Sequence, residues 1–250
     1  MKDHRFIFVN GLHRSGTSLL YRILSAQDDV SGFANTKVPE DEGQHLQSVY
    51  GAAKEYGGPG KFGFDQSSFL DENSPILTEE NKALLFTQWA RHWDLSKTWL
   101  AEKSPPNLVR TRFLQKAFPD SWFITIMRHP LAVSFATKKW SKTSIPSLVD
   151  HWLRCHDRFL ADAPKLDHSL MLRYENLVAD PEAELSKLSD FLGFQVKLPE
   201  GTVLKAGVNE KYFDMWRKYK KGFWTKRLSE IAIRKYSEAV QQYGYSLDES

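Results

Sequence analysis

The sequence predicts an α/β protein of three layers, in which helices cover both faces of a central parallel sheet. Short apolar runs rich in β-forming residues alternate along the chain with longer segments whose apolar residues recur at helical spacing. Strands that alternate with helices build parallel sheets covered on both faces. A length of 250 residues favours one large domain, 1–250, over two.

Composition and charge exclude several classes of protein. Lys and Arg number 34 against 31 Asp and Glu, and this net charge of +3 argues against a protein whose main partner is nucleic acid. No window approaches the ~18 apolar residues of a membrane span, and the apolar run 6–9 is too short for a signal peptide. The single cysteine, Cys155, excludes an intrachain disulfide and a thiolate metal cluster. We therefore expect a cytoplasmic protein.

The expected elements follow one another in a regular alternation. The first strand covers 5–10 and stops at Gly11, and a helix begins near Ser15. Residues 28–45 are expected to form a loop that leads into a new helix start, and the glycine-rich 56–72 a mobile flap. The later elements are helices over 78–93, 106–118, 130–140, 145–160, 181–192 and 227–243, and strands over 98–101, 122–127 and 169–173.

A glycine motif separates the first strand from the first helix. Gly11-Leu-His-Arg-Ser-Gly-Thr-Ser18 lies where the backbone N–H groups of a helix N-terminus can hold a phosphate. The spacing matches the Walker frame G-x4-G-K-[ST], except that Thr17 replaces the lysine. The alternative is an ordinary glycine turn capped by Ser15. Because Arg14 and Ser18 converge on the same turn, we favour the phosphate loop.

A second anion site is predicted at the end of the strand over 122–127. Arg128 closes this strand and Pro130 begins the next helix, so a phosphate there would meet a guanidinium and unpaired N–H donors together. The alternative is a surface salt bridge. Ser134 and Thr137, on neighbouring turns of the helix, are candidate hydroxyl ligands, and we favour Ser134.

These segments resemble the sulfotransferase family. Residues 11–18 look like its 5′-phosphosulfate loop, P-[KR]-S-G-T-[ST], with His13 in place of the proline. Residues 123–134 resemble the segment that grips the 3′-phosphate of the sulfate donor 3′-phosphoadenosine 5′-phosphosulfate (PAPS), although the family serine commonly falls where this chain has Ala136. Residues 172–181 resemble the Y-E-[DN]-L-x-x-[DN]-P segment. The resemblance implies a fold like that of P-loop nucleoside triphosphatases, PAPS as donor and no required metal.

The resemblance, which extends from residue 6 to about 195, also implies roles for single residues. Arg14 matches the basic residue of the loop, and Tyr174 would bound the adenine. Lys103 lies in a stretch, 102–107, similar to one in carbohydrate-type and bacterial members, and it would neutralise charge at the transferred group or the leaving group. The donor-binding residues implied in this way are Arg14, Ser15, Gly16, Thr17, Ser18, Arg128, Ser134 and Tyr174.

A general base must take the proton of the acceptor hydroxyl. The acidic segment after the first helix lies where several sulfotransferases that act on tyrosine or sugars place a catalytic glutamate. We favour Glu42, then Glu40, with His45 as the histidine alternative. Adjacent acids at a helix start are also common as simple helix-start charges. The alternative for Lys103 is a solvated lysine before a helix.

The predicted activity is in-line transfer of the PAPS sulfuryl group to a hydroxyl acceptor, which releases adenosine 3′,5′-bisphosphate (PAP). A P-loop kinase for small molecules, which Thr17 disfavours, and a non-catalytic nucleotide-bisphosphate-binding protein are the alternatives. The aromatic and basic segment 205–227 is expected to form a lid over the nucleotide. The acceptor is expected to be a small molecule or carbohydrate, and the oligomeric state stays open.

Overall fold

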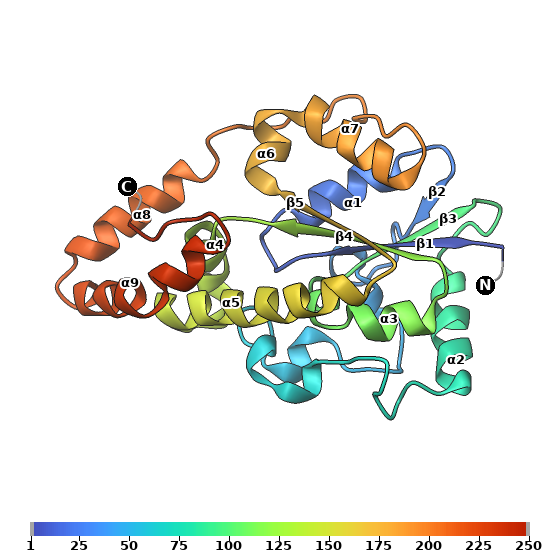
Figure 1. Ribbon diagram of the computed structural model, residues 1–250, viewed down its shortest axis with the longest axis horizontal. Helices are drawn as coiled ribbons and strands as arrows, with labels where there is room; N and C mark the ends of the chain where they lie inside the picture. Colours follow the sequence, from blue (N-terminus) through green and yellow to red (C-terminus); the bar gives the residue numbers. More distant parts are fainter. Residues whose placement is uncertain (1–2, 249–250) are drawn as a thin grey trace.

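The computed structural model describes residues 3–248 and has a five-stranded, all-parallel sheet at its centre (Figure 1). The strand order is β2-β3-β1-β4-β5. The strands are β1 Arg5–Asn10, β2 Val30–Gly32, β3 Trp99–Lys103, β4 Ser121–Met127 and β5 His168–Arg173. The predicted α/β class is confirmed, while β2 lies in a segment expected to be loop.

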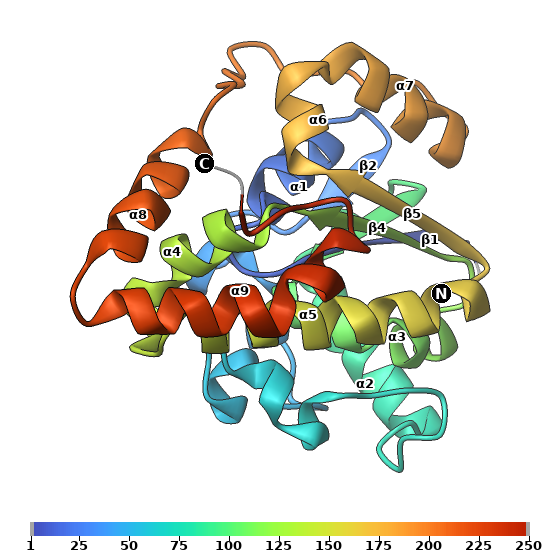
Figure 2. The same cartoon turned by 60° about the vertical axis from the view of Figure 1, so that its left-hand side comes forward.

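Helices cover both faces of this sheet (Figures 1 and 2). They are α1 Thr17–Ser25, α2 Glu79–Ala90, α3 Thr111–Ala117, α4 Pro130–Ser141, α5 Ile145–Asp162, α6 Tyr174–Ala179, α7 Pro181–Leu192, α8 Glu210–Lys221 and α9 Thr225–Gln241. In β1, Ile7 and Val9 pack with α1 and α7, whereas Phe6 and Phe8 pack with α2 and α3. This alternation explains why the central strand is apolar at successive positions.

The region around β3 differs from the prediction. The strand runs past Ala101 to Lys103, so Glu102 and Lys103 are fully buried strand residues. The helix expected over 106–118 is a 3-10 turn at Pro105–Val109 followed by the separate helix α3. The break falls at Arg110, whose φ of −136° lies outside the helical region and separates the turn from α3.

The glycine-rich segment 56–72 folds into short 3-10 turns against α5. Phe62 is fully buried, and a Cβ added at Gly60 would lie 2.4 Å from Cδ2 of Leu148. The segment therefore packs closely in this structure, and its predicted mobility stays a prediction. Within residues 3–248 no helix has the length and apolar character needed to cross a membrane.

Candidate functional site

The loop between β1 and α1 has the shape of an anion cradle. Gly11 has a φ of 145°, and a Cβ there would lie 2.3 Å from the carbonyl oxygen of Ile126, so only glycine fits. Oγ of Ser15 donates to the carbonyl of Leu12 at 2.6 Å and so fixes the loop. Gly16, with a φ of 106°, is the N-cap of α1 and provides no side-chain cap. The first N–H groups of α1 are therefore available to a ligand.

A cavity of about 330 Å³ opens beside this helix start. It lies between the first turn of α1, Tyr174 of α6 and the segment before α8. Its lining includes the cationic side chains of Arg14, Arg22, Arg128 and Lys205. This concentration of positive charge suits a ligand that carries more than one phosphate or sulfate group.

Arg128 lies at the end of β4 with only 6% of its surface exposed. Its Nε donates to Oδ1 of Asn209 at 2.9 Å, its Nη1 donates to the carbonyl of Arg14 at 3.0 Å, and the guanidinium stands 4.2 Å from the ring centroid of Tyr174. Burial lowers the pKa of Arg128 from its ordinary value. Its Nη2 is buried and has no hydrogen-bond partner within residues 3–248, which leaves a donor for an anion.

Asn209, which the sequence reasoning did not select as a site residue, holds Arg128 in place. Its Nδ2 donates to Oε1 of Glu175 at 2.6 Å. Glu175 also accepts from the backbone N–H of His129 at 3.0 Å and from the hydroxyl of Tyr245 at 2.9 Å. Glu175 belongs to the Y-E motif, and Asn209 lies within the segment 205–227 expected to form a lid, although no motif singled it out.

Ser134 and Thr137 do not line the cavity that contains Arg128. Both hydroxyls are buried and lack hydrogen-bond partners in the described part of the chain. They face a separate space of about 10 Å³, lined also by His13 and His151, which is about the size of one water molecule. The rotation of α4 turns these positions towards α5, so the structure does not bring the favoured Ser134 together with Arg128.

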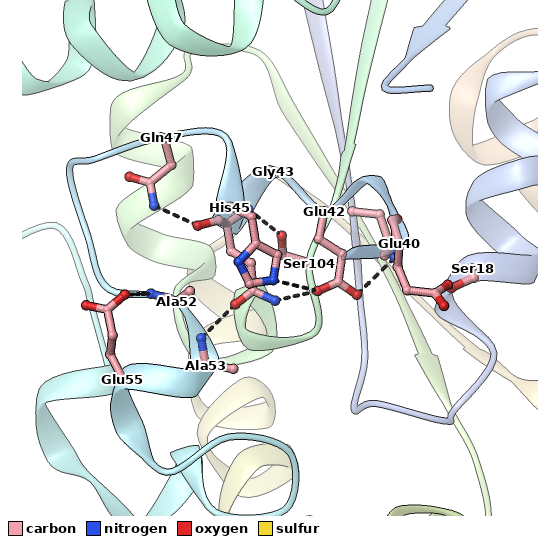
Figure 3. A network of polar contacts seen from close by, with 12 residues as sticks. Ser18, Glu40, Glu42, Gly43, His45, Gln47, Ala52, Ala53, Glu55 and Ser104 are labelled. Atoms are coloured by element: carbon pink, nitrogen blue, oxygen red, sulfur yellow. Dashed lines mark hydrogen bonds and ion pairs between the residues drawn. The ribbon is translucent and has the colours of Figure 1, made fainter. Parts of the chain in front are cut away.

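The acidic segment forms two tight turns beside the phosphate loop (Figure 3). Oε1 of Glu42 accepts a hydrogen bond from Nζ of Lys103 at 3.0 Å, and both side chains are almost fully buried, at 8% and 1% exposure. The other Glu42 oxygen accepts from Gln44 and lies 3.9 Å from Nε2 of His45. The alternative of a solvated lysine is therefore wrong, because Lys103 is the partner of a buried carboxylate.

Glu40 joins this ion pair to the phosphate loop. Its backbone carbonyl accepts from Nζ of Lys103 at 3.0 Å, and its exposed carboxylate accepts from Oγ of Ser18 at 3.2 Å (Figure 3). β1 and β3 are neighbours, with Val9 beside Lys103, so the end of β3 lies next to the loop. The predicted donor-binding loop and the predicted base segment thus form one continuous site.

Glu102 stabilises the acidic turns indirectly, through Ser104. Burial raises the pKa of its carboxyl to about 7, and it accepts from Oγ of Ser104 at 2.5 Å. Oγ of Ser104 in turn accepts from the backbone N–H of Gln44 at 2.9 Å. A Cβ at Gly43 would lie 2.4 Å from Oε1 of Glu102, so a glycine is needed beside Glu42.

Two histidines near this site are neutral at ordinary pH. Burial lowers the pKa of His45, and burial together with the nearby charge of Lys103 lowers the pKa of His13 to about 3. A neutral imidazole can accept a proton. His45 therefore remains an alternative to Glu42 as the base.

The predicted lid adjoins the cavity only in its first part. Within the predicted lid, Lys205 and Val208 line the cavity and Asn209 binds Arg128, while Val203 and Leu204 line it just before the lid begins. Phe223 and Trp224, in the second part of the segment, do not line this cavity. They follow the C-terminal end of α8 and are 87% and 83% exposed. The expected covering role of this second part is not seen in this structure.

A comparison with known protein families matches the part of the chain that holds most of the site residues. A family model described as "Sulfotransferase family" matches residues 6–197, a range that contains Arg14, Glu42, Lys103, Arg128 and Tyr174. The chain belongs to the sulfotransferase family. Asn209 lies beyond the matched range, in keeping with its absence from the motifs.

Known relatives also support membership of the sulfotransferase family, and a solved structure has the same fold. This sulfotransferase is 27% identical over 199 residues to protein-tyrosine sulfotransferase 1 of Danio rerio (76% of this chain, 54% of that protein). It is 24% identical over 201 residues to protein-tyrosine sulfotransferase 2 of Gallus gallus (77% and 52%). The chain thus spans about half the length of these curated relatives. The sulfotransferase domain from the curacin biosynthetic pathway shares its fold, with a TM-score of 0.54, 17% identity and coverage of 97% of this chain and 98% of that one.

Proposed function

We propose that this sulfotransferase moves the sulfuryl group of PAPS to a hydroxyl acceptor and releases PAP. One observation carries the proposal: a phosphate loop without the Walker lysine opens onto the cavity of Arg128 and adjoins the buried Glu42–Lys103 pair. The transferred sulfuryl group carries less charge than a phosphoryl group, so loop N–H groups and basic side chains can replace Mg²⁺ and lysine. Among residues 3–248 no group of three or more His, Cys, Asp or Glu side chains is arranged to hold a metal ion.

Donor binding would use both anion sites. The N–H groups of the loop, together with Arg14, Thr17 and Ser18, would hold the 5′-phosphosulfate. The free Nη2 of Arg128 would donate to the 3′-phosphate, as an unpaired buried donor requires. The ring of Tyr174, which lines the same cavity, would bound the adenine.

The transfer itself needs one proton acceptor and one cation. The acceptor oxygen attacks sulfur in line, the bond from sulfur to the 5′-phosphate oxygen breaks, and PAP leaves with the electron pair. The hydroxyl proton passes to the carboxylate of Glu42. Protonation neutralises Glu42 and ends its ion pair with Lys103, so the ammonium can then offset the charge on the departing oxygen.

Glu42 is favoured over its neighbours because of its surroundings. It is held by Lys103 and Gln44 in a buried position, which is how a base is kept aligned. Glu40 is exposed and is engaged by Ser18 through its side chain, a geometry that suits a role in joining the loop to the turn.

The acceptor class is proposed to be a hydroxyl on a sugar or a polar small molecule. The curated relatives are named for protein tyrosine, so a tyrosyl peptide belongs in the same screen. Purified protein would be incubated with labelled PAPS and oligosaccharides, polar alcohols or tyrosyl peptides, with Glu42→Gln as the control. Transfer to a peptide alone would overturn the acceptor class, and transfer that Glu42→Gln leaves intact would overturn the base.

A nucleotide-binding assay separates this function from its rivals. Thermal protection by PAP without Mg²⁺ is expected here, whereas protection by ATP that needs Mg²⁺ would indicate a kinase. PAP binding with no transfer to any acceptor would favour a non-catalytic binding protein. The cytoplasmic location stays a prediction, and fractionation of cells that produce the protein would test it.

A further inference from the structure

The turn between α8 and α9 presents two adjacent aromatic side chains to solvent. Phe223 is 87% and Trp224 is 83% exposed, and their ring centroids lie 5.0 Å apart. Both ribbon views place this turn at the outer edge of the molecule, away from the sheet (Figures 1 and 2). Neither residue lines the cavity beside α1. Large apolar side chains exposed together mark an interaction site.

Positive charge surrounds this aromatic pair. Residues 217–227 contain six Lys and Arg and no Asp or Glu, whereas the whole chain carries a net charge of only +3, so the remainder is net negative. α8 buries Tyr212, Trp216 and Tyr219 on one face, which leaves its other face to solvent. Exposed basic side chains from both helices adjoin the turn: Lys218, Lys221, Lys226 and Arg227.

We propose that this basic aromatic tip, residues 217–227, docks on an anionic phospholipid surface. Clusters of four to eight Lys and Arg on an amphipathic helix are a pattern that binds acidic lipids, and each cation near the surface contributes roughly fivefold in affinity. Phe and Trp side chains gain free energy at the boundary between headgroups and acyl chains. The tip offers both kinds of group on one protruding corner.

Other occupants fit these observations less well. A polyanion in water would satisfy the cations and leave the two rings exposed. A second copy of the tip would bring like charges together, which opposes association. A nucleotide lid conflicts with the geometry, because Asn209 at the start of α8 holds Arg128 while the rings follow its far end, about 18 Å along a helix of this length.

The test is flotation of the full chain with lipid vesicles. The protein is expected to float with vesicles of phosphatidylcholine mixed with phosphatidylserine, but not with phosphatidylcholine alone, and added salt should release it. The double variants Phe223→Ser/Trp224→Ser and Lys221→Glu/Lys226→Glu should each lower the bound fraction at least about tenfold. Trp224→Phe should keep binding and lose the blue shift of tryptophan emission that vesicles cause.

Matched variants elsewhere on the surface control for general effects. Leu84→Ser/Leu95→Ser removes two apolar side chains that are 39% and 45% exposed, and Arg91→Glu/Lys197→Glu reverses two exposed charges. Both should keep vesicle binding, and PAP should still stabilise every variant.

Four outcomes would overturn the proposal. These are equal losses in the control variants, binding to dextran sulfate but not to vesicles, self-association through the tip without vesicle binding, and quenching of Trp224 by PAP in the absence of lipid.

Discussion

Oδ1 of Asn209 accepts a hydrogen bond from Nε of Arg128 at 2.9 Å, although 81 residues separate the two in the chain. This bond, with the bond from Nη1 to the carbonyl of Arg14, directs the remaining guanidinium nitrogen. The anion site at the end of β4 is thus completed by the residue that precedes α8. A ligand held by Arg128 would therefore also depend on how the segment before α8 packs.

Arg128→Ala should weaken PAP binding by about 2–5 kcal/mol, because it removes a buried, charge-assisted contact to the 3′-phosphate. Adenosine 5′-monophosphate lacks that phosphate, and its affinity should change by less than about 1 kcal/mol. Isothermal titration with both nucleotides measures the difference. Ser134→Ala is the control and should keep PAP affinity, since its hydroxyl faces another cavity. Equal losses for both nucleotides would remove Arg128 from the 3′-phosphate site.

Asn209→Ala should weaken PAP binding by about 1–2 kcal/mol, because Arg128 loses a hydrogen-bond partner and Glu175 loses a donor. The KM for PAPS should rise while kcat stays near the wild-type value. In a double-mutant cycle with Arg128→Ala, the two losses should not add. Additive losses, or an equal effect on adenosine 5′-monophosphate, would show that Asn209 acts only on local stability.

Glu42→Gln should lower kcat by about 10²–10⁴-fold, because the amide cannot take the acceptor proton. PAP affinity should stay close to wild type, since Glu42 does not line the cavity beside α1. Single-turnover transfer from labelled PAPS gives the rate, and circular dichroism checks that the variant, in which Lys103 has lost its ion-pair partner, still folds. Glu40→Gln and His45→Asn are the comparison variants. A larger loss of kcat in either would move the base to that residue.

Stability should fall as the pH drops below about 6.5, because buried histidines resist protonation in the folded chain. Burial lowers the pKa of His151 to about 3 and that of His156 to about 4. The unfolded chain therefore takes up protons first as the pH falls, and His156 alone should remove roughly 1–2 kcal/mol by about pH 5. Urea unfolding at each pH measures this. His156→Gln should flatten the acid side of the profile, and an unchanged slope would contradict the assignment.

Much of the fold could be predicted because short stretches of sequence indicate where individual strands and helices lie. β1 and β4 are apolar at successive positions, and α4 and α7 begin at Pro130 and Pro181 as expected. The end of β3 was missed because Glu102 and Lys103 are charged, and charged residues rarely lie buried in a strand. Their partners, Ser104, Asn107 and Glu42, come from a turn after the strand and from a loop about sixty residues earlier.

The site residues that belong to a sequence motif could be predicted. Those whose position depends on the packing of helices and loops could not. The phosphate loop and Arg128 each follow a strand, so their place at the carboxyl edge of the sheet follows from the pattern. The direction of Ser134 depends on the rotation of α4 against α5, which spacing alone leaves open. Asn209 lies within the expected lid, but no spacing or motif distinguishes it from its neighbours, and its contact with Arg128 identifies it as a site residue.

The position of β1 between β3 and β4 determines when the phosphate loop can form during synthesis of the chain. β1 pairs with β3 and β4, whose residues follow it by about 90 and 115 positions, so both neighbours of the phosphate loop are synthesised long after it. Contacts between such distant parts of a chain form slowly, because the intervening loop must close first. A nascent chain shorter than the end of β4 cannot assemble the anion cradle, and the complete nucleotide site, which includes Tyr174 and Asn209, forms only later in synthesis.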